Sequence, residues 1–229
     1  MKKKIFIACD TTSASEVKKI IKFTEKSKLN IGYKFGLEFF NSKNGRLFLS
    51  KIKKKDIWLD LKLFDIPNTV GSAITSLKDL KNLKYLTIHI SGGLEMMRSA
   101  KIAANKTNKK LKIIGVTVLT SFSDKSLKKT GHSKNIKKIV TIQAKLAKTA
   151  KLDGIVCSGH EVQIVKKICK GMEIITPGIR LLGDGFQDQK RVIDPLKAFS
   201  IGATGIVIGR SITNGNIKKN IQKLIKSLK

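Results

Sequence analysis

The sequence predicts an α/β fold, a single (β/α)8 barrel in which eight parallel strands form a ring inside a layer of helices. Short apolar runs recur along the 229 residues, so that one strand-plus-helix unit takes roughly 29 residues, which is typical of a parallel sheet. Most of these runs are separated by lysine-rich stretches with helical spacing. Because no linker or low-complexity segment interrupts the pattern, we expect one domain that spans residues 1–229.

The expected strands are the apolar runs themselves, whose lengths are usual for strands. They lie at residues 5–9, 31–35, 57–61, 85–90, 113–119, 154–157, 173–176 and 205–208. The expected helices place apolar side chains on one face and lysines on the other, and they lie at residues 15–26, 69–80, 94–104, 136–148, 162–168 and 195–199. The pattern is weakest at 37–55, where Asn44 and Gly45 fragment the helix, and in the loop 180–193.

The formal net charge of +31 raises the question of a nucleic-acid partner. Nearly all of this charge is lysine, and it is spread over nearly every expected helix, whereas arginine occurs only at positions 46, 98, 180, 191 and 210. Recognition of bases and phosphates usually relies on clustered arginine and aromatic residues. We therefore expect a solvated basic surface with no specific nucleic-acid partner, although its positive field would attract anionic metabolites.

The remaining composition indicates a soluble cytoplasmic protein. No apolar stretch approaches the roughly 20 residues that a membrane helix needs, and the run at 5–9 is too short for a signal peptide and ends at Asp10. The cysteines are Cys9, Cys157 and Cys169, an odd number without metal-like spacing. A reducing compartment suits them, and we interpret them as small buried apolar residues.

The predicted barrel also predicts where its chemistry lies, because active sites of this fold form at the C-terminal ends of the strands. Those ends carry most of the polar groups that the expected strands possess. They are Asp10, Lys34, Asp60, Lys62, Asp65, His89, Thr120, Ser158, Gly178, Arg180, Gly209 and Arg210.

Four of these residues form an alternating charged array: Lys34, Asp60, Lys62 and Asp65. Asp60 and Lys62 share one face if the strand continues, because side chains alternate with period two. All four converge if the second and third strands are neighbours, and each charge then has neighbours of opposite sign that keep it ionised. Burying such groups costs free energy, so coupled charges in a cleft indicate a catalytic site more often than a structural network.

A phosphate site is expected at the ends of the seventh and eighth strands. Residues 203–212 read ATGIVIGRSI, a strand followed by Gly209, Arg210 and the start of a helix. Gly209 permits close approach of an anion, helix N–H groups face it, and Arg210 can bind its oxygens in a bidentate manner. The segment TPGIR at 176–180 supplies the matching turn after the seventh strand, and phosphate sites at these two loops are common in this fold.

These motifs, in this order, resemble the bacterial type of the orotidine 5′-phosphate decarboxylase family over essentially the whole chain. The matching segments are IACD at 7–10, YKFG at 33–36, DLKLFDIPNT at 60–69, HISGG at 89–93, VTVLTS at 116–121, TPGIR at 176–180, DQKR at 188–191 and IVIGRSI at 206–212. The resemblance implies a homodimeric barrel that converts orotidine 5′-monophosphate to UMP and CO₂, the last step of de novo UMP synthesis. It also implies that the reaction requires no metal and no organic cofactor.

The resemblance also implies roles for the array. Lys62 resembles the general acid that protonates C6 of the pyrimidine, and Asp60 resembles the carboxylate beside the substrate carboxylate. Lys34 resembles the lysine that completes the array and contacts the ribose. Asp65 matches the aspartate that reaches into the neighbouring subunit's site, with Thr69 nearby.

The other site residues are implied to bind substrate. Asp10 resembles the acid that binds a ribose hydroxyl, Thr120 the pyrimidine contact and Gln189 a loop residue that touches substrate. The residues on the phosphate side are Arg180, Gly209 and Arg210.

Two alternatives remain. One is a Mg²⁺-dependent sugar-phosphate decarboxylase or aldolase that shares the pattern D-x-K-x-x-D, although such enzymes use an acidic metal ligand near the second strand, where this chain has Lys34. The other is a basic nucleic-acid-binding protein on a decayed barrel, which predicts loss of the array residues. We interpret His89 as a structural histidine.

Overall fold

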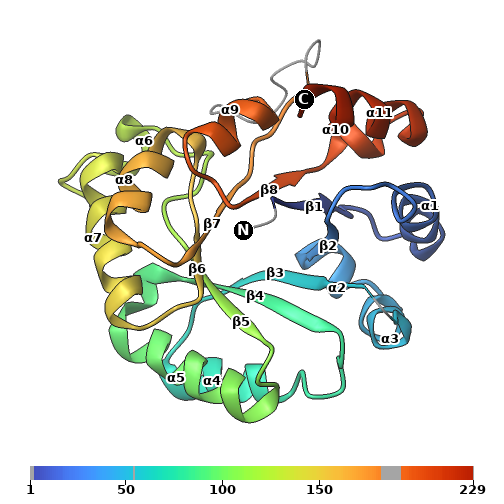
Figure 1. Ribbon diagram of the computed structural model, residues 1–229. Coiled ribbons are helices and arrows are strands. Elements are labelled where there is room, and N and C mark those ends of the chain that lie inside the picture. Colours follow the sequence, from blue (N-terminus) through green and yellow to red (C-terminus); the bar gives the residue numbers. More distant parts are fainter. Residues whose placement is uncertain (1–2, 54, 182–191, 229) are drawn as a thin grey trace.

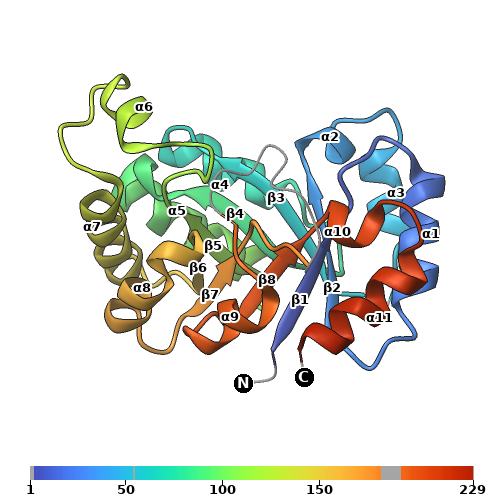
Figure 2. The same ribbon diagram turned by 90° about the horizontal axis from the view of Figure 1, so that it is seen from above.

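The barrel prediction is confirmed. The computed structural model, which describes residues 3–53, 55–181 and 192–228, contains a closed barrel of parallel strands in the order β1 to β8. Figure 1 shows the helices arranged around the outside of this ring. In Figure 2, β1 rises from the lower, N-terminal end of the barrel, and α6 lies at the upper end, where the strands finish.

The strands lie close to the apolar runs. They are β1 (Lys4–Ala8), β2 (Ile31–Gly36), β3 (Ile57–Leu63), β4 (Leu83–His89), β5 (Lys112–Val116), β6 (Gly154–Val156), β7 (Glu173–Thr176) and β8 (Gly205–Ile208). Most bounds lie within two residues of expectation, and two differences bear on the site. The fifth strand ends at Val116 rather than at residue 119, and β3 continues to Leu63 through an irregular segment that carries part of the charged array.

The helices alternate with the strands. The α-helices are α1 (Ala14–Thr24), α2 (Leu37–Phe40), α3 (Gly45–Lys51), α4 (Pro67–Thr75), α5 (Gly93–Thr107), α6 (Asp124–Lys128), α7 (Ile136–Thr149), α8 (Val162–Ile168), α9 (Pro195–Ser200), α10 (Arg210–Thr213) and α11 (Ile217–Ser227). Short 3₁₀ turns, η1 (Ile90–Gly92) and η2 (Gly159–Glu161), follow β4 and β6. Side chains of Ser13, Asn135, Asp194 and Asn216 cap α1, α7, α9 and α11, respectively, by accepting backbone hydrogen bonds.

Two segments show how local chemistry sets the helix bounds. The interrupted pattern at 37–55 forms two short helices, and Gly45, the first residue of α3, lies so close to Phe39 that an added Cβ would be 1.8 Å from the Phe39 carbonyl oxygen. The helix expected at 69–80 instead begins at Pro67, a favoured first position, and ends at Thr75. Leu77 and Leu80, whose spacing suggested a longer helix, are buried in turns after it.

The interior of the barrel is filled in its lower part. Phe6 lies edge-on to two other rings, with centroids 4.7 Å away at Trp58 and 4.9 Å away at Tyr85. Gly32 provides the room, because a Cβ at this position would lie 3.0 Å from the Phe6 ring. A second, larger apolar layer packs between the barrel and the helices. These packed rings close the interior below the upper end, where the strands finish.

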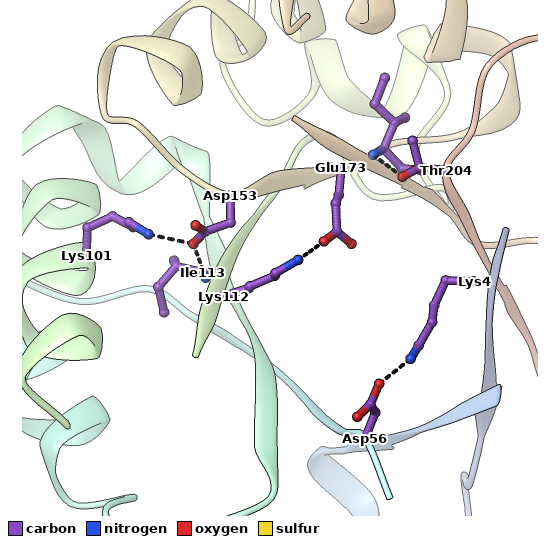
Figure 3. Close-up of polar contacts among 9 residues, drawn as sticks. Lys4, Asp56, Lys101, Lys112, Ile113, Asp153, Glu173 and Thr204 are labelled. Atoms are coloured by element: carbon purple, nitrogen blue, oxygen red, sulfur yellow. Dashed lines mark hydrogen bonds and ion pairs between the residues drawn. The ribbon is translucent and has the colours of Figure 1, made fainter. Parts of the chain in front are cut away.

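Ion pairs join the strands at the lower end of the barrel. Figure 3 shows Lys4 of β1 directed at Asp56, and Lys112 of β5 directed at Glu173 of β7. Asp153, just before β6, accepts hydrogen bonds from Lys101 Nζ at 2.6 Å and from the Ile113 backbone N–H at 2.7 Å. These contacts link residues that are distant in sequence, so they stabilise closure of the ring rather than any one helix.

Two findings bear on the composition. Within the ranges described above, no helix combines the length and apolar character needed to cross a membrane. Cys9, Cys157 and Cys169 are all buried and unbridged, which agrees with their interpretation as small core residues.

Stability should depend on the lower-end ion pairs in a pH-dependent way. Burial raises the pKa of Asp56, but hydrogen bonds and charges from Lys4 and Lys84 outweigh it and lower that pKa below its usual value. A lowered pKa contributes stability above the unfolded-state value, about 3.9, and this contribution is lost as the pH falls through the folded-state pKa. We expect Asp56→Asn to lower the free energy of unfolding at pH 7 by about 1 kcal/mol, since the group is partly solvated. Urea unfolding at pH 7 and pH 3 measures this.

The matched control is Asp79→Asn, because Asp79 forms an exposed ion pair with Arg46. We expect it to cost at most a few tenths of a kcal/mol, roughly the value of a surface pair. An Asp56→Asn penalty that is as large at pH 3 as at pH 7 would contradict the assignment.

Candidate active site

A cavity of about 250 Å³ opens at the upper end of the barrel. Its wall combines strand ends and the loops after them, as the fold predicts. Most of the predicted site residues line it, namely Asp10, Lys34, Asp60, Lys62, Thr120, Arg180, Gly209 and Arg210. Ser158 and Gly178 also line it, whereas His89 does not.

The charged residues form a continuous alternating chain in this cavity. Lys34 Nζ lies 3.0 Å from Asp10 Oδ1 and 3.5 Å from Asp60 Oδ2. The same Asp60 oxygen lies 2.9 Å from Lys62 Nζ. The neighbouring positions of β1, β2 and β3 in the sheet bring these groups together. The order along the chain of contacts is therefore Asp10, Lys34, Asp60, Lys62, with each charge beside one of opposite sign.

The contacts keep the two most deeply buried members charged. Burial raises the pKa of Asp60, but the charges of Lys34 and Lys62 and hydrogen bonds from Lys62 and Thr87 lower it below its usual value. Burial lowers the pKa of Lys34, but Asp60 and Asp10 raise it above its usual value. The side chains of Lys34 and Asp60 are 10% and 12% exposed, whereas that of Lys62 is 34% exposed. Lys62 is thus the more open of the two lysines in the array.

Lys62 reaches this position by an irregular route. The expected regular alternation holds at Asp60, but β3 then shifts register against β4, and Lys62 has a positive φ of 48°. Such a bulge redirects a side chain, and bulges are frequent next to active sites. The prediction that Asp60 and Lys62 lie together is met, although the backbone between them is a bulge rather than a flat strand.

Asp65 and Thr69 lie apart from the array. The side chain of Asp65 is exposed and accepts a hydrogen bond from the Ile66 backbone N–H at 2.7 Å, and in the described part of the chain it makes no ion pair. Thr69 is exposed in the first turn of α4. Neither residue lines the cavity. One chain therefore brings together only three of the four array residues predicted to converge.

The predicted phosphate side forms the part of the wall that follows β7 and β8. Gly209 is the residue before α10, and a Cβ there would lie 3.5 Å from Ala8 Cβ and 3.9 Å from Asp10 Oδ2. Gly178 has a φ of 75°, which favours glycine in the turn before Arg180. The Arg180 backbone N–H donates to the Ile193 carbonyl at 3.1 Å, which ties the two sides of that loop together. Gln189 lies outside the described residues.

Thr87 lies beside the site and was not among the residues predicted from the sequence. Its hydroxyl contacts Asp60 and the backbone of Lys62. The available signal was its position in the apolar run LKYLTIH, where alternation with Tyr85 and His89 places it inside the barrel. His89, at the end of β4, packs against Phe64 with ring centroids 5.8 Å apart, as suits a structural histidine.

Comparisons with known proteins place the chain in a family. The sequence model of the orotidine 5′-phosphate decarboxylase / HUMPS family matches residues 3–223. The chain belongs to this family. A curated relative from Wolbachia sp. subsp. Brugia malayi, named orotidine 5′-phosphate decarboxylase, is 44% identical over 96% of this chain and 96% of its own. One of the same name from Fusobacterium nucleatum is 39% identical over 100% and 96%.

Solved structures agree with the family assignment. The crystal structure of orotidine 5′-phosphate decarboxylase from Lactobacillus acidophilus superposes with a TM-score of 0.85 at 29% identity, covering 99% of each chain. Family membership thus extends over the barrel as a whole, and the resemblance seen in the motifs is confirmed.

The coupling between Lys34 and Asp60 can be tested in this protein without a bound substrate. Lys34→Met leaves Asp60 buried with Lys62 as its remaining cation, so we expect the pKa of Asp60 to rise. We also expect a loss of about 2–4 kcal/mol in the free energy of unfolding at pH 7, because a buried charge loses a partner. The loss should shrink as the pH falls and Asp60 takes up a proton.

Carboxyl NMR titration measures the pKa, and urea unfolding measures the stability. Lys137→Met, at an exposed position of α7, is the control and should change neither. An unchanged pKa of Asp60 in Lys34→Met would show that the two groups are not coupled.

Proposed function

We propose that this chain decarboxylates orotidine 5′-monophosphate to UMP and CO₂ as a cytoplasmic homodimer, without a metal or organic cofactor. The observation that carries the proposal is the position of Lys62, a partly open ammonium group fixed by Asp60 at 2.9 Å inside the cavity. The names of the curated relatives support the same activity.

The reaction explains why a fixed ammonium group is needed. Loss of CO₂ leaves negative charge on C6 of the pyrimidine, a carbon with no electron sink. Lys62 stabilises this charge through its positive field and then delivers its proton to C6. Because Asp60 holds Lys62 before the substrate arrives, little reorganisation is needed when the charge develops.

Asp60 has a second role in the proposal. Its carboxylate lies beside the carboxylate of the bound substrate, and the repulsion between them is relieved as CO₂ leaves. The lowered pKa of Asp60 supports this role, because it keeps the group ionised before the substrate binds. Lys34 keeps Asp60 charged and contacts the ribose, together with Asp10.

The rest of the cavity binds the parts of the substrate that do not react. Thr120 contacts the pyrimidine, and Gln189 contacts the substrate from its loop. Arg180, Gly209 and Arg210 bind the phosphate at the part of the wall that follows β7 and β8. Binding energy from this remote phosphate offsets the cost of placing the substrate carboxylate beside Asp60.

The Mg²⁺-dependent alternative is disfavoured by Lys34. Its Nζ atom lies within 3.0 Å of Asp10 and 3.5 Å of Asp60, so it occupies the two carboxylates that a divalent ion would need. Two cations at this spacing repel strongly in a poorly solvated site. A nucleic-acid-binding protein on a decayed barrel would have lost the array, yet the contacts among Asp10, Lys34, Asp60 and Lys62 are intact.

The homodimer completes the site in this proposal. Asp65 is flanked by two exposed apolar side chains, Phe64 at 64% and Ile66 at 65% exposure. An apolar pair around a charged residue at the rim suits a buried contact between copies of the chain. The contact carries Asp65 and Thr69 into the neighbouring protomer's cavity, where Asp65 becomes the fourth member of the array.

The primary test follows the loss of ultraviolet absorbance on adding orotidine 5′-monophosphate in excess EDTA. We expect the wild type to turn over, and Lys62→Ala to lose at least about 10³-fold in kcat because both the proton donor and the local field are removed. Lys137→Ala, on the exposed face of α7, is the control and should keep kcat within about twofold.

Two results would contradict the proposal. A folded wild type without activity would remove the decarboxylase assignment. Activity that EDTA abolishes would favour the Mg²⁺-dependent alternative.

Shared sites predict complementation between inactive variants. Lys62→Ala and Asp65→Asn alone should each be inactive, but a mixed dimer has one cavity with both residues intact. An equimolar mixture that exchanges subunits should therefore recover about one quarter of wild-type activity, since half of the dimers are mixed and each has one intact site. Activity is measured after mixing by the absorbance assay.

Asp60→Asn with Lys62→Ala is the matched control. Both residues belong to the same chain's contribution, so the mixed dimer has no intact cavity and should remain inactive. Recovery in this control, or none in the first mixture, would refute the sharing of Asp65.

A further inference from the structure

Thr87, in the middle of β4, is fully buried and does not line the cavity. Its hydroxyl nevertheless makes two hydrogen bonds to the reactive segment of β3. It donates to Asp60 Oδ1 at 2.9 Å and accepts from the Lys62 backbone N–H at 3.0 Å. One side chain thus holds the two residues on which the proposed chemistry depends.

The contact with Lys62 replaces a missing backbone hydrogen bond. Leu59 pairs with Leu86 and Leu63 pairs with Ile88, so β3 advances four residues while β4 advances two. A bulge of this kind interrupts the ladder and leaves backbone groups unpaired. The Thr87 hydroxyl accepts the Lys62 N–H in place of a carbonyl of β4, and so satisfies a partly buried donor that would be costly to leave unpaired.

The two oxygen atoms of the Asp60 carboxylate have different partners. Oδ1 receives the Thr87 hydroxyl, while Oδ2 lies 2.9 Å from Lys62 Nζ and 3.5 Å from Lys34 Nζ. Because a carboxylate is planar, fixing Oδ1 also fixes the direction in which Oδ2 faces. Thr87 therefore orients the Asp60 side chain and the Lys62 backbone at the same time.

We propose that Thr87 is a positioning residue for the decarboxylation: its hydroxyl holds the bulge at Lys62 and the plane of the Asp60 carboxylate, so that the ammonium group is aimed at the reacting carbon. The proposal rests on the function proposed above. Thr87 acts through Asp60 and Lys62 and touches no substrate atom.

The role predicts a particular kinetic pattern for Thr87→Val, which keeps the shape of the side chain but removes the hydroxyl. Displacing a catalytic group by about 1 Å can cost roughly 10²-fold in rate. The phosphate-side residues stay in place, so binding should change little. We expect kcat to fall by about 10- to 100-fold, with KM within about threefold of the wild type.

The pH profile should move as well. Asp60 faces Lys34 from β2, Lys62 from its own strand and His89 from β4, and Lys34 in turn contacts Asp10. Thr87 adds a hydrogen bond that lowers the pKa of Asp60, after the effects of burial and of both lysines. Its loss raises that pKa, and the acid limb of kcat should move to higher pH.

The experiment compares Thr87→Val with Thr87→Ser, which restores the hydroxyl, and with Thr176→Val in β7. Thr176 is equally buried, but its hydroxyl has no hydrogen-bond partner among the described residues. Steady-state kinetics give kcat and KM, and carboxyl NMR titration gives the pKa of Asp60 without any need for turnover. Urea unfolding of all three variants separates lost positioning from lost stability.

The expected result is a fall in kcat and a raised Asp60 pKa in Thr87→Val, both largely reversed in Thr87→Ser. Thr176→Val should leave the Asp60 pKa unchanged. A Thr87→Val enzyme within twofold of wild-type kcat, or a Thr87→Ser enzyme as impaired as Thr87→Val, would overturn the proposal.

Failure of the role proposed for Thr87 can be distinguished from failure of the proposed decarboxylase function. If Thr87→Val does not fold, Thr87→Ala takes its place in the comparison with serine. If the wild type lacks decarboxylase activity, the proposed function fails, whereas an unchanged Asp60 pKa in the valine variant refutes the positioning by Thr87 itself.

Discussion

The Asp60 carboxylate, shared between the ammonium groups of Lys34 and Lys62, is the interaction on which the upper end of the barrel depends. A buried charge without a partner shifts its pKa and becomes neutral. Here burial acts against the charge of Lys34 and of Asp60, and the opposite charges beside them outweigh it. Alternation therefore lets charged groups occupy a position that packing alone would fill with apolar side chains. Lys62, as the end of this chain of contacts, is held in place without being fully buried.

The lower part of the barrel supplies the stability that offsets the cost of burying these charges. Phe6, Trp58 and Tyr85 fill the interior beneath the cavity, and ion pairs at the N-terminal end connect β1 to Asp56 and β5 to β7. Because the ring is closed, a strand cannot slide without disturbing its neighbours on both sides. The burial free energy of the two apolar layers offsets the cost of desolvating the array. The packed lower end therefore serves stability, and the charged upper end carries the candidate site.

The sequence predicts the ring and the charged array well because both follow from local patterns. Apolar runs mark strands, and the fold places their C-terminal ends together, so Lys34, Asp60 and Lys62 were expected to meet. The bulge at Lys62 and the role of Thr87 depend on the register between β3 and β4, which no local pattern encodes. Asp65 could not be placed from one chain alone, because in the proposed dimer it joins the array of the neighbouring protomer. The end of α4 was misjudged because Leu77 and Leu80 keep helical spacing while packing in turns.

Lysines on the helices and lysines in the cavity have different roles in this chain. Most lysines project from helices into solvent, where salt and water screen their charge. They produce the net charge of +31 and a field that attracts anions without orienting them. Lys34 and Lys62 belong to the same residue type, but each lies against a carboxylate in the cavity. A field brings an anionic ligand to the surface, whereas stabilising charge on one carbon atom requires an ammonium group fixed to within about half an ångström. In the proposed mechanism Lys62 is held by Asp60 and Thr87, which are not basic, so the net charge of the protein does not indicate its chemistry.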